Sequence, residues 1–371
     1  RTARAQDRMA AAGLDALLLT TEPELRYYTG FLTRFWESPT RPWFLVLPAT
    51  GKPIAVIPSI GAHLMGQTWV QDIRTRAAPD YDDDGVGLMA ETLRDVASSR
   101  GCNGLADQME SHVRMPLAGL QALEGQLEGR SIVSDCGITR DLRMVKSEAE
   151  IAKIRQAVGV GTRAFDRVPE IACEGVPLER VFRDFQRLCL EEGADWVPYL
   201  AGAAAPCGFG DVISPATDRP LTDGDVLMMD TGLVQDGYFC DFDRNFSVGP
   251  ASASVTAAHS RLVEATVAAF EIAKPGAFIS DLFHAMQRVA DPEGTADSAG
   301  RLGHGLGMQL TEWPSIIAAD HTVLQPGMVL TLEPSVARPE GKLMVHEENI
   351  VIREDGAEWL TVPEIPEVRV I

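Results

Sequence analysis

The sequence is short of positive charge. Its 33 lysines and arginines are outnumbered by 53 aspartates and glutamates, which gives a formal net charge of −20. Nucleic acids and anionic membranes are bound through basic patches, so we expect neither as a partner.

Long apolar runs and paired cysteines are also missing. No apolar run reaches the roughly 18 residues that a membrane-spanning helix needs, and no signal peptide is recognisable, so we expect a cytoplasmic protein. The six cysteines lie far apart without C-x-x-C spacing. This disfavours a zinc ribbon or a disulfide framework, and buried free thiols are expected instead.

The first part of the chain alternates helical and strand patterns. It predicts an α/β domain over residues 1–143, one of two domains that a chain of 371 residues can hold. The predicted helices cover 1–12 and 89–99, and the predicted strands cover 14–19, 43–47 and 53–57.

The second domain is expected to span 144–371 and to follow the first without a charged or low-complexity linker. Ser147 and Glu150 form an S-x-x-E capping box, which predicts that a helix over 148–167 opens this domain. Two successive stretches then follow the same order of helix, turn, helix and strand. The first ends at Asp230 and the second at Glu333, so we predict an α+β domain built as a pseudo-twofold duplication.

Both of these strands end in a carboxylate. Gly224 and Gly327 each open an apolar run, and Asp230 and Glu333 follow six positions after them. Burying an unpaired carboxylate costs several kcal/mol, so each acid needs a cationic side chain or a metal nearby.

Further acids and one histidine are expected to join these two carboxylates. A hairpin after Asp230 returns a strand that sets Asp241 opposite it, and Asp243 shares the face of Asp241 because side chains alternate. A later strand carries Glu347, with His346 and Glu348 on its other face. A glycine-rich stretch surrounds His304.

Four carboxylates in one place require compensating charge that their sequence neighbours do not supply. Two divalent cations would neutralise Asp230, Asp241, Glu333 and Glu347, with His304 completing the shell, as in two-metal hydrolases. Oxygen and imidazole ligands of this kind suit Mn, Fe, Co and Zn alike.

Five segments carry a resemblance to a known family. They are 230–241 with Gly237 and Tyr238, 303–307 around His304, 326–334, Glu347 with Asn349 and Ile350, and 28–31 in the first domain. They resemble the pita-bread metallopeptidases, which include prolidase, aminopeptidase P, methionine aminopeptidase and creatinase, and the first domain resembles the prolidase and creatinase branch.

The resemblance implies a ligand set and a reaction. Asp230 and Asp241 would hold one metal, while Asp241, His304, Glu333 and Glu347 would hold the second, with Glu347 also bridging. The implied activity is hydrolysis of a peptide or small amide bond, of the Xaa-Pro type, by a metal-bound hydroxide. Glu333 would relay the proton to the leaving nitrogen.

The chain departs from the peptidases at accessory positions. Thr311 stands seven positions after His304, where the peptidases have a catalytic histidine, and we expect it to be catalytic together with Glu333 and His304. Thr can donate a hydrogen bond but carries no positive charge. Ile213 and Val345 replace a further histidine and an arginine. These changes leave open a non-peptidase enzyme, such as a dimethylsulfoniopropionate-type lyase that the run 312–314 also resembles, with Asp243 or Asp230 as base. A binding protein without catalysis is a third reading.

Aromatic residues suggest where the substrate lies. Trp36 falls in a stretch predicted to be an exposed turn, with Arg41 close by, and Trp313 follows Thr311. In the family that the chain resembles, the first domain often closes over the partner's site. We therefore expect a homodimer in which Trp36 or Arg41 approaches the neighbouring site, with Trp313 and Asp243 also contacting the substrate.

Overall fold

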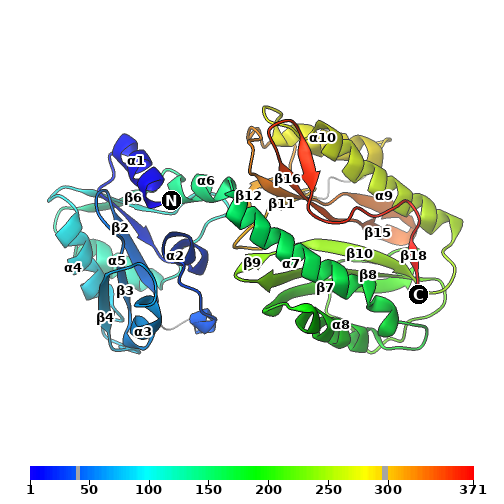
Figure 1. Cartoon of the computed structure of the whole chain (residues 1–371), viewed down its shortest axis with the longest axis horizontal. Helices are drawn as coiled ribbons and strands as arrows, with labels where there is room; N and C mark the ends of the chain where they lie inside the picture. The colour runs from blue at the N-terminus through cyan, green and yellow to red at the C-terminus, as the bar shows by residue number, and fades with distance from the viewer. Residues whose placement is uncertain (39–41, 295–299) are drawn as a thin grey trace. The chain divides into compact units, whose positions relative to one another are not determined.

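The computed structural model describes residues 1–38, 42–294 and 300–371, and Arg41 therefore lies outside the described residues. The chain divides into two compact units, Arg1–Arg143 and Met144–Ile371 (Figure 1). Among the described residues, no helix combines the length and apolar character that a membrane span requires.

The first unit is built on one mixed sheet with the strand order β4-β3-β2-β1-β5-β6. Every residue of β1, β2 and β3 is buried, as expected for apolar strands covered on both faces. The elements are α1 (Thr2–Ala12), β1 (Ala16–Leu19), α2 (Glu22–Thr29), η1 (Phe35–Glu37), β2 (Phe44–Pro48), β3 (Ile54–Pro58), η2 (Ser59–Gly61), α3 (Ala62–Met65), β4 (Asp72–Arg76), α4 (Val86–Val96), β5 (Cys102–Leu105), α5 (Leu117–Gly125), β6 (Ser131–Ser134) and α6 (Ile138–Met144).

The predicted elements of this unit are present with shifted ends. The first helix ends where Gly13 adopts φ 69°, a left-handed cap that favours glycine. The helix predicted over 89–99 instead runs from Val86 to Val96, because the backbone is already extended at Ala97. Its apolar face joins β1, β2 and β3 in the core of the unit.

The first half of the second unit starts with two helices that pack against a sheet of order β18-β10-β8-β7 (Figure 1). The capping box of Ser147 and Glu150 is confirmed, and the helix that it opens ends at Asp166. The elements are α7 (Glu148–Asp166), η3 (Val168–Glu170), α8 (Leu178–Glu192), β7 (Trp196–Pro206), β8 (Asp225–Gln235), β9 (Tyr238–Phe239) and β10 (Phe242–Ser247).

The second half repeats this order of two helices followed by strands, as the predicted duplication requires. Its main sheet has the order β12-β11-β13-β16-β17, while β14 pairs with β15 and β18 joins the sheet of the first half. The elements are α9 (Ala253–Ile272), α10 (Ile279–Ala290), β11 (His304–Gly305), β12 (Glu312–Ser315), β13 (Val329–Leu332), β14 (Ser335–Arg338), η4 (Pro339–Gly341), β15 (Lys342–Val345), β16 (Glu348–Ile352), β17 (Ala357–Trp359) and β18 (Arg369–Val370). An apolar core cluster packs these helices against β13, β15 and β16.

Two details of the strands differ from the prediction. β8 does not end at Asp230 but continues to Gln235, because the hairpin turn lies at Asp236 and Gly237, which both have positive φ. The antiparallel register then pairs Asp230 with Asp243 rather than with Asp241. The strand predicted across 345–352 is likewise interrupted, since β15 ends at Val345 and β16 begins after Glu347.

Candidate metal centre

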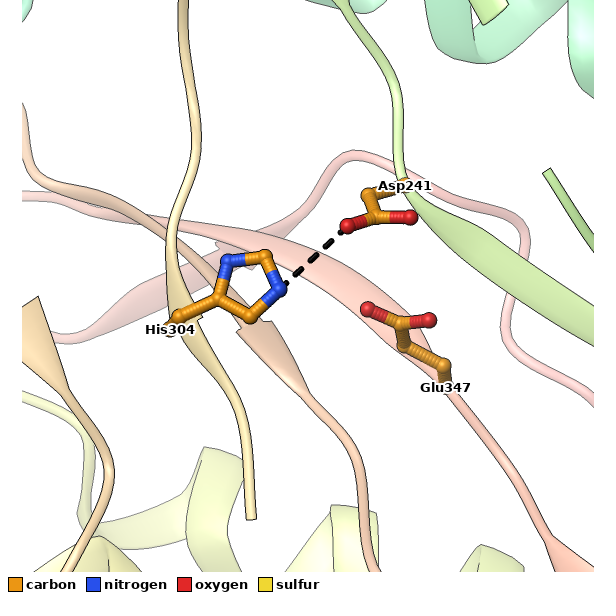
Figure 2. A group of neighbouring side chains, drawn as sticks. All are labelled: Asp241, His304 and Glu347. Atoms are coloured by element: carbon orange, nitrogen blue, oxygen red, sulfur yellow. Dashed lines mark ion pairs between the residues drawn. The ribbon is translucent and has the colours of Figure 1, made fainter. Parts of the chain in front are cut away.

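Three side chains from distant parts of the second unit converge in the structure. Asp241, His304 and Glu347 are buried, and each offers a ligand atom within 4.8 Å of the others. Nε2 of His304 lies 3.3 Å from Oδ2 of Asp241. Figure 2 shows the imidazole and the two carboxylates pointing toward a common space. Such a group of one nitrogen and several oxygens is a typical donor set for a first-row divalent metal.

Breaks in regular strands place these side chains. Asp241 lies between β9 and β10, and Glu347 lies between β15 and β16, so neither side chain is forced into the alternation of a sheet. His304 begins the short strand β11, where its N–H donates to Oγ1 of Thr331 at 3.1 Å. Its Nδ1 lies 2.9 Å from the carbonyl oxygen of Gly305. A proton on Nδ1 would be held there, so that Nε2, which faces Asp241, can serve as the ligand atom.

Asp230 and Glu333 lie beside this group. The hydroxyl of Tyr199 donates to Oδ2 of Asp230 at 2.9 Å. Burial and the neighbouring carboxylate of Asp241 raise the pKa of Asp230 well above its ordinary value. Burial also raises the pKa of Glu333 to about 7, although His304 opposes that shift. The negative charge of Asp241 therefore contributes to the raised pKa of both acids.

The cluster contains more negative charge than its protein neighbours compensate. Burial and neighbouring carboxylates raise the pKa values of Asp241 and Glu347 well above normal. Among the described residues, Oδ1 of Asp230, Oδ1 of Asp241 and Oε1 of Glu347 are buried and accept no hydrogen bond. Buried carboxylate oxygens normally have partners. These orphaned oxygens fit divalent cations, so the residues present suit the metal that the sequence predicts.

Sequence reasoning missed one cation near the cluster. Arg301 lowers the pKa of Asp241 and of Glu333, although burial raises both. Its Nη2 donates to Oγ1 of Thr311 at 3.1 Å. The predicted catalytic Thr311 thus holds a guanidinium where the peptidases have a histidine. Arg301 lies three positions before His304 in the sequence. An arginine at that position does not by itself indicate that its side chain lies near the acids.

A second layer of buried charge lies behind Glu347. Oδ1 of Asp243 accepts a hydrogen bond from the N–H of Glu347 at 2.9 Å and lies 3.3 Å from Nδ1 of His346. Nε2 of His346 is 3.1 Å from Oε1 of Glu348. Burial opposes a charged imidazole, but these two carboxylates overcome it and raise the pKa of His346 to about 9. Burial likewise opposes the Glu348 carboxylate, yet Arg244 at 3.1 Å and His346 hold its pKa at about 2.

The aromatic residues predicted to contact the substrate have structural contacts of their own. Nε1 of Trp313 donates to Oγ1 of Thr322 at 3.2 Å, and its ring packs against the core of the unit. The prediction that Trp36 lies exposed in a turn is wrong. Trp36 is 7% exposed, packs against Trp43 at a centroid distance of 5.8 Å, and has the Arg114 guanidinium 5.1 Å from the centre of its ring. Substrate contact by these residues remains a prediction.

Comparisons with known proteins identify the family of the chain. The model of the metallopeptidase family M24 matches residues 152–354, and the creatinase/prolidase N-terminal domain matches residues 1–145. The chain belongs to metallopeptidase family M24. It is therefore a metal-dependent hydrolase, and the predicted family and two-domain fold are confirmed.

Several relatives of this M24 member are named as dipeptidases. It is 32% identical over 360 residues to the probable dipeptidase PepE of Mycobacterium bovis, covering 96% of this chain and 92% of that one. It is 29% identical over 228 residues to the Xaa-Pro dipeptidase of Pyrococcus furiosus, covering 61% and 66% of the two chains. The crystal structure of dipeptidase PepE from Mycobacterium ulcerans matches with a TM-score of 0.85 and 28% identity, over 100% of this chain and 96% of that one.

Proposed function

We propose that this M24 hydrolase cleaves short peptides as a dipeptidase, with Xaa-Pro dipeptides as the first substrates to test. Two divalent cations would be held by Asp230, Asp241, His304, Glu333 and Glu347. The observation that carries the proposal is the set of orphaned, buried carboxylate oxygens in the cluster of Asp230, Asp241 and Glu347. Divalent cations bound there would provide a water nucleophile at neutral pH and polarise the scissile carbonyl.

Glu333 is the best placed proton carrier among these acids. It is half-buried, whereas Asp241 and Glu347 are buried. We therefore assign Glu333 the transfer of a proton to the leaving nitrogen, as the sequence predicts.

Arg301 is proposed to recognise the negative end of the substrate. The hydrogen bond that its guanidinium donates to Oγ1 of Thr311 orients it, and its charge acts on Asp241 and Glu333. A guanidinium binds a carboxylate through two parallel hydrogen bonds, which suits the C-terminus of a dipeptide. Arg301 and Thr311 would thus replace the missing histidine in substrate binding, but not in proton transfer.

Three finer statements belong to the same proposal. Manganese is favoured as the cation because most of the donors are carboxylates, which suit it. A cytoplasmic homodimer follows from the resemblance to prolidases. Light scattering on the purified protein and metal analysis after expression without added metal test the two molecular claims.

The decisive experiment compares substrates on one enzyme preparation. The chain is stripped with chelator, loaded with Mn, Fe, Co or Zn, and incubated with Xaa-Pro dipeptides, matched dipeptides without proline, and sulfonium compounds. Release of free amine from dipeptides is expected, and Asp241→Asn should abolish it. Alkene formation from a sulfonium compound without amine release would overturn the proposal in favour of the lyase reading.

A further inference from the structure

A buried ion pair lies outside the metal cluster and has no part in the reaction described above. Nζ of Lys146 is 3.0 Å from Oε2 of Glu312, and these side chains are only 2% and 5% exposed. A buried pair of this kind gains little net stability, because removing both charges from water costs about as much as their attraction returns. Its position in the fold therefore needs another explanation.

The Glu312 carboxylate organises the loop 306–311, which connects His304 and Gly305 to β12. Its Oε1 accepts hydrogen bonds from the N–H groups of Met308 (2.8 Å) and Gln309 (3.2 Å). A Cβ added at Gly307 would lie 2.8 Å from both carboxylate oxygens, so the loop closes tightly around this side chain. Thr311, which holds Arg301, is the last residue of the loop.

The same loop contacts the first half of the unit close to the predicted ligands. The N–H of Phe239, two residues before Asp241, donates to the carbonyl oxygen of Gly307 at 2.9 Å. The side chain of Leu310 lies against Gly232, two residues after Asp230, and leaves no room there for a Cβ. A shift of the loop would therefore disturb both halves of the site.

Lys146 is itself fixed to the strand that leads to Glu333. Its N–H donates to the carbonyl oxygen of Gly327 at 2.8 Å, and its Nζ also donates to the carbonyl oxygen of Met144 at 3.3 Å. Gly327 precedes β13, and Glu333 directly follows that strand. Lys146 thus links the loop 306–311, through Glu312, to the segment that leads into β13 and Glu333.

We propose that Lys146 and Glu312 are positioning residues, which hold the loop 306–311 so that Thr311 and Arg301 face the substrate. Glu312 acts through the hydrogen bonds that it accepts from the loop amides, and Lys146 acts through Glu312. The inference rests on the proposed function for its kinetic consequence, but the loop itself can be observed independently of activity.

Two near-isosteric variants test the pair in the full-length, metal-loaded protein. Glu312→Gln keeps an acceptor for the loop amides but removes the charge, and Lys146→Met removes the other charge. Each should raise KM for the dipeptide substrate and lower kcat/KM roughly 10- to 100-fold, with metal content unchanged. A merely structural role would lower the folded fraction, and so the apparent kcat, without changing KM. Arg155→Met is the matched control, because Arg155 and Glu358 form an exposed pair at 2.6 Å.

Hydrogen exchange supplies the readout that does not depend on turnover. Peptides that cover 306–311 should exchange several-fold faster in Glu312→Gln and Lys146→Met than in the parent or in Arg155→Met. If a single variant is unstable, the double variant removes both buried charges and should fold, with a kinetic defect no larger than that of Glu312→Gln alone.

The outcomes separate the two proposals. A parent protein that hydrolyses no dipeptide refutes the proposed function. Faster hydrogen exchange of the loop in the variants would still support the positioning role of Lys146 and Glu312. Unchanged exchange, or an unchanged KM despite faster exchange, overturns the positioning role. Additive kinetic defects in the double variant would also overturn it, because the two residues would then not act as a pair.

Discussion

One carboxylate oxygen of Asp243 serves both the backbone and the side chain of the segment before β16. It accepts the N–H of Glu347 at 2.9 Å and lies 3.3 Å from Nδ1 of His346. Both side chains, Asp243 and His346, are 1% exposed or less. The contact fastens β10 to the break between β15 and β16, and it thereby fixes where Glu347 enters the cluster.

Asp243→Ala is predicted to lower the free energy of unfolding by about 3–5 kcal/mol. The substitution leaves the Glu347 N–H unsatisfied and removes one partner of a buried charge. Asp243→Asn should cost less, because the amide oxygen can still accept that N–H. Urea unfolding of the metal-free proteins measures both, with the exposed Glu354→Ala as control. A change below about 0.5 kcal/mol for Asp243→Ala would show that the contact does not stabilise the fold.

Tyr199→Phe is predicted to weaken metal binding roughly tenfold while leaving the fold intact. The hydroxyl is the donor that orients Oδ2 of Asp230, and groups that orient a metal ligand typically contribute this much. Competition with a fluorescent chelator measures the affinity. Tyr28→Phe is the matched control, since its hydroxyl lies 3.2 Å from Thr139 in the first unit. Equal affinities for Tyr199→Phe and Tyr28→Phe would argue that Asp230 is not a ligand.

Metal binding is predicted to release protons, and metal-free protein should lose stability as the pH rises from about 5 to 8. The pKa of Glu333 is raised to about 7, and those of Asp230, Asp241 and Glu347 are raised well above normal. The folded metal-free protein therefore holds protons that the unfolded chain has already lost, so raising the pH favours unfolding. Metal must displace these protons to reach the carboxylates.

Calorimetry in two buffers of different ionisation enthalpy counts the protons that manganese releases at pH 6. Thermal unfolding with chelator, from pH 5 to pH 8, measures the stability. Glu333→Gln should flatten this pH dependence, because it removes the group with a pKa of about 7. Stability of the metal-free protein that rises over this range would contradict the arrangement of acids.

Arg301→Met is predicted to raise KM about 10- to 100-fold for a dipeptide and to leave KM unchanged for the corresponding dipeptide amide. Hydrogen bonds to a charged group contribute about 1.5–3 kcal/mol, and the amide lacks the carboxylate that would receive them. Thr311→Val should give a smaller effect of the same kind, because the guanidinium loses one contact that orients it. Steady-state kinetics on both substrates decides the matter. An equal loss on both would assign Arg301 to the reaction rather than to substrate recognition.

The sequence predicted the fold well wherever local chemistry decides it. The capping box at Ser147, the left-handed glycine after α1 and the repeated order of helices and strands all follow from residue types at short spacing. Strand ends were harder to predict. The turn at Asp236 and Gly237 was visible, but its effect on the register, which sets Asp243 opposite Asp230, depends on the break at Asp241.

The candidate site was predictable in its residue types but not in its surroundings. A buried acid at the end of an apolar run demands compensation, and that argument leads to the cluster without a structure. The contacts of Arg301 with Thr311 and of Lys146 with Glu312 join residues whose spacing follows no helix or strand period. The prediction that Trp36 is exposed was wrong for a related reason, since only the folded first unit shows that Trp43 and Arg114 pack against it.

The five residues of the predicted metal site are divided between the two repeats of the second unit. Asp230 and Asp241 come from the first repeat, and His304, Glu333 and Glu347 come from the second. Neither repeat carries all five residues, so the cluster can form only where both repeats are folded and packed together.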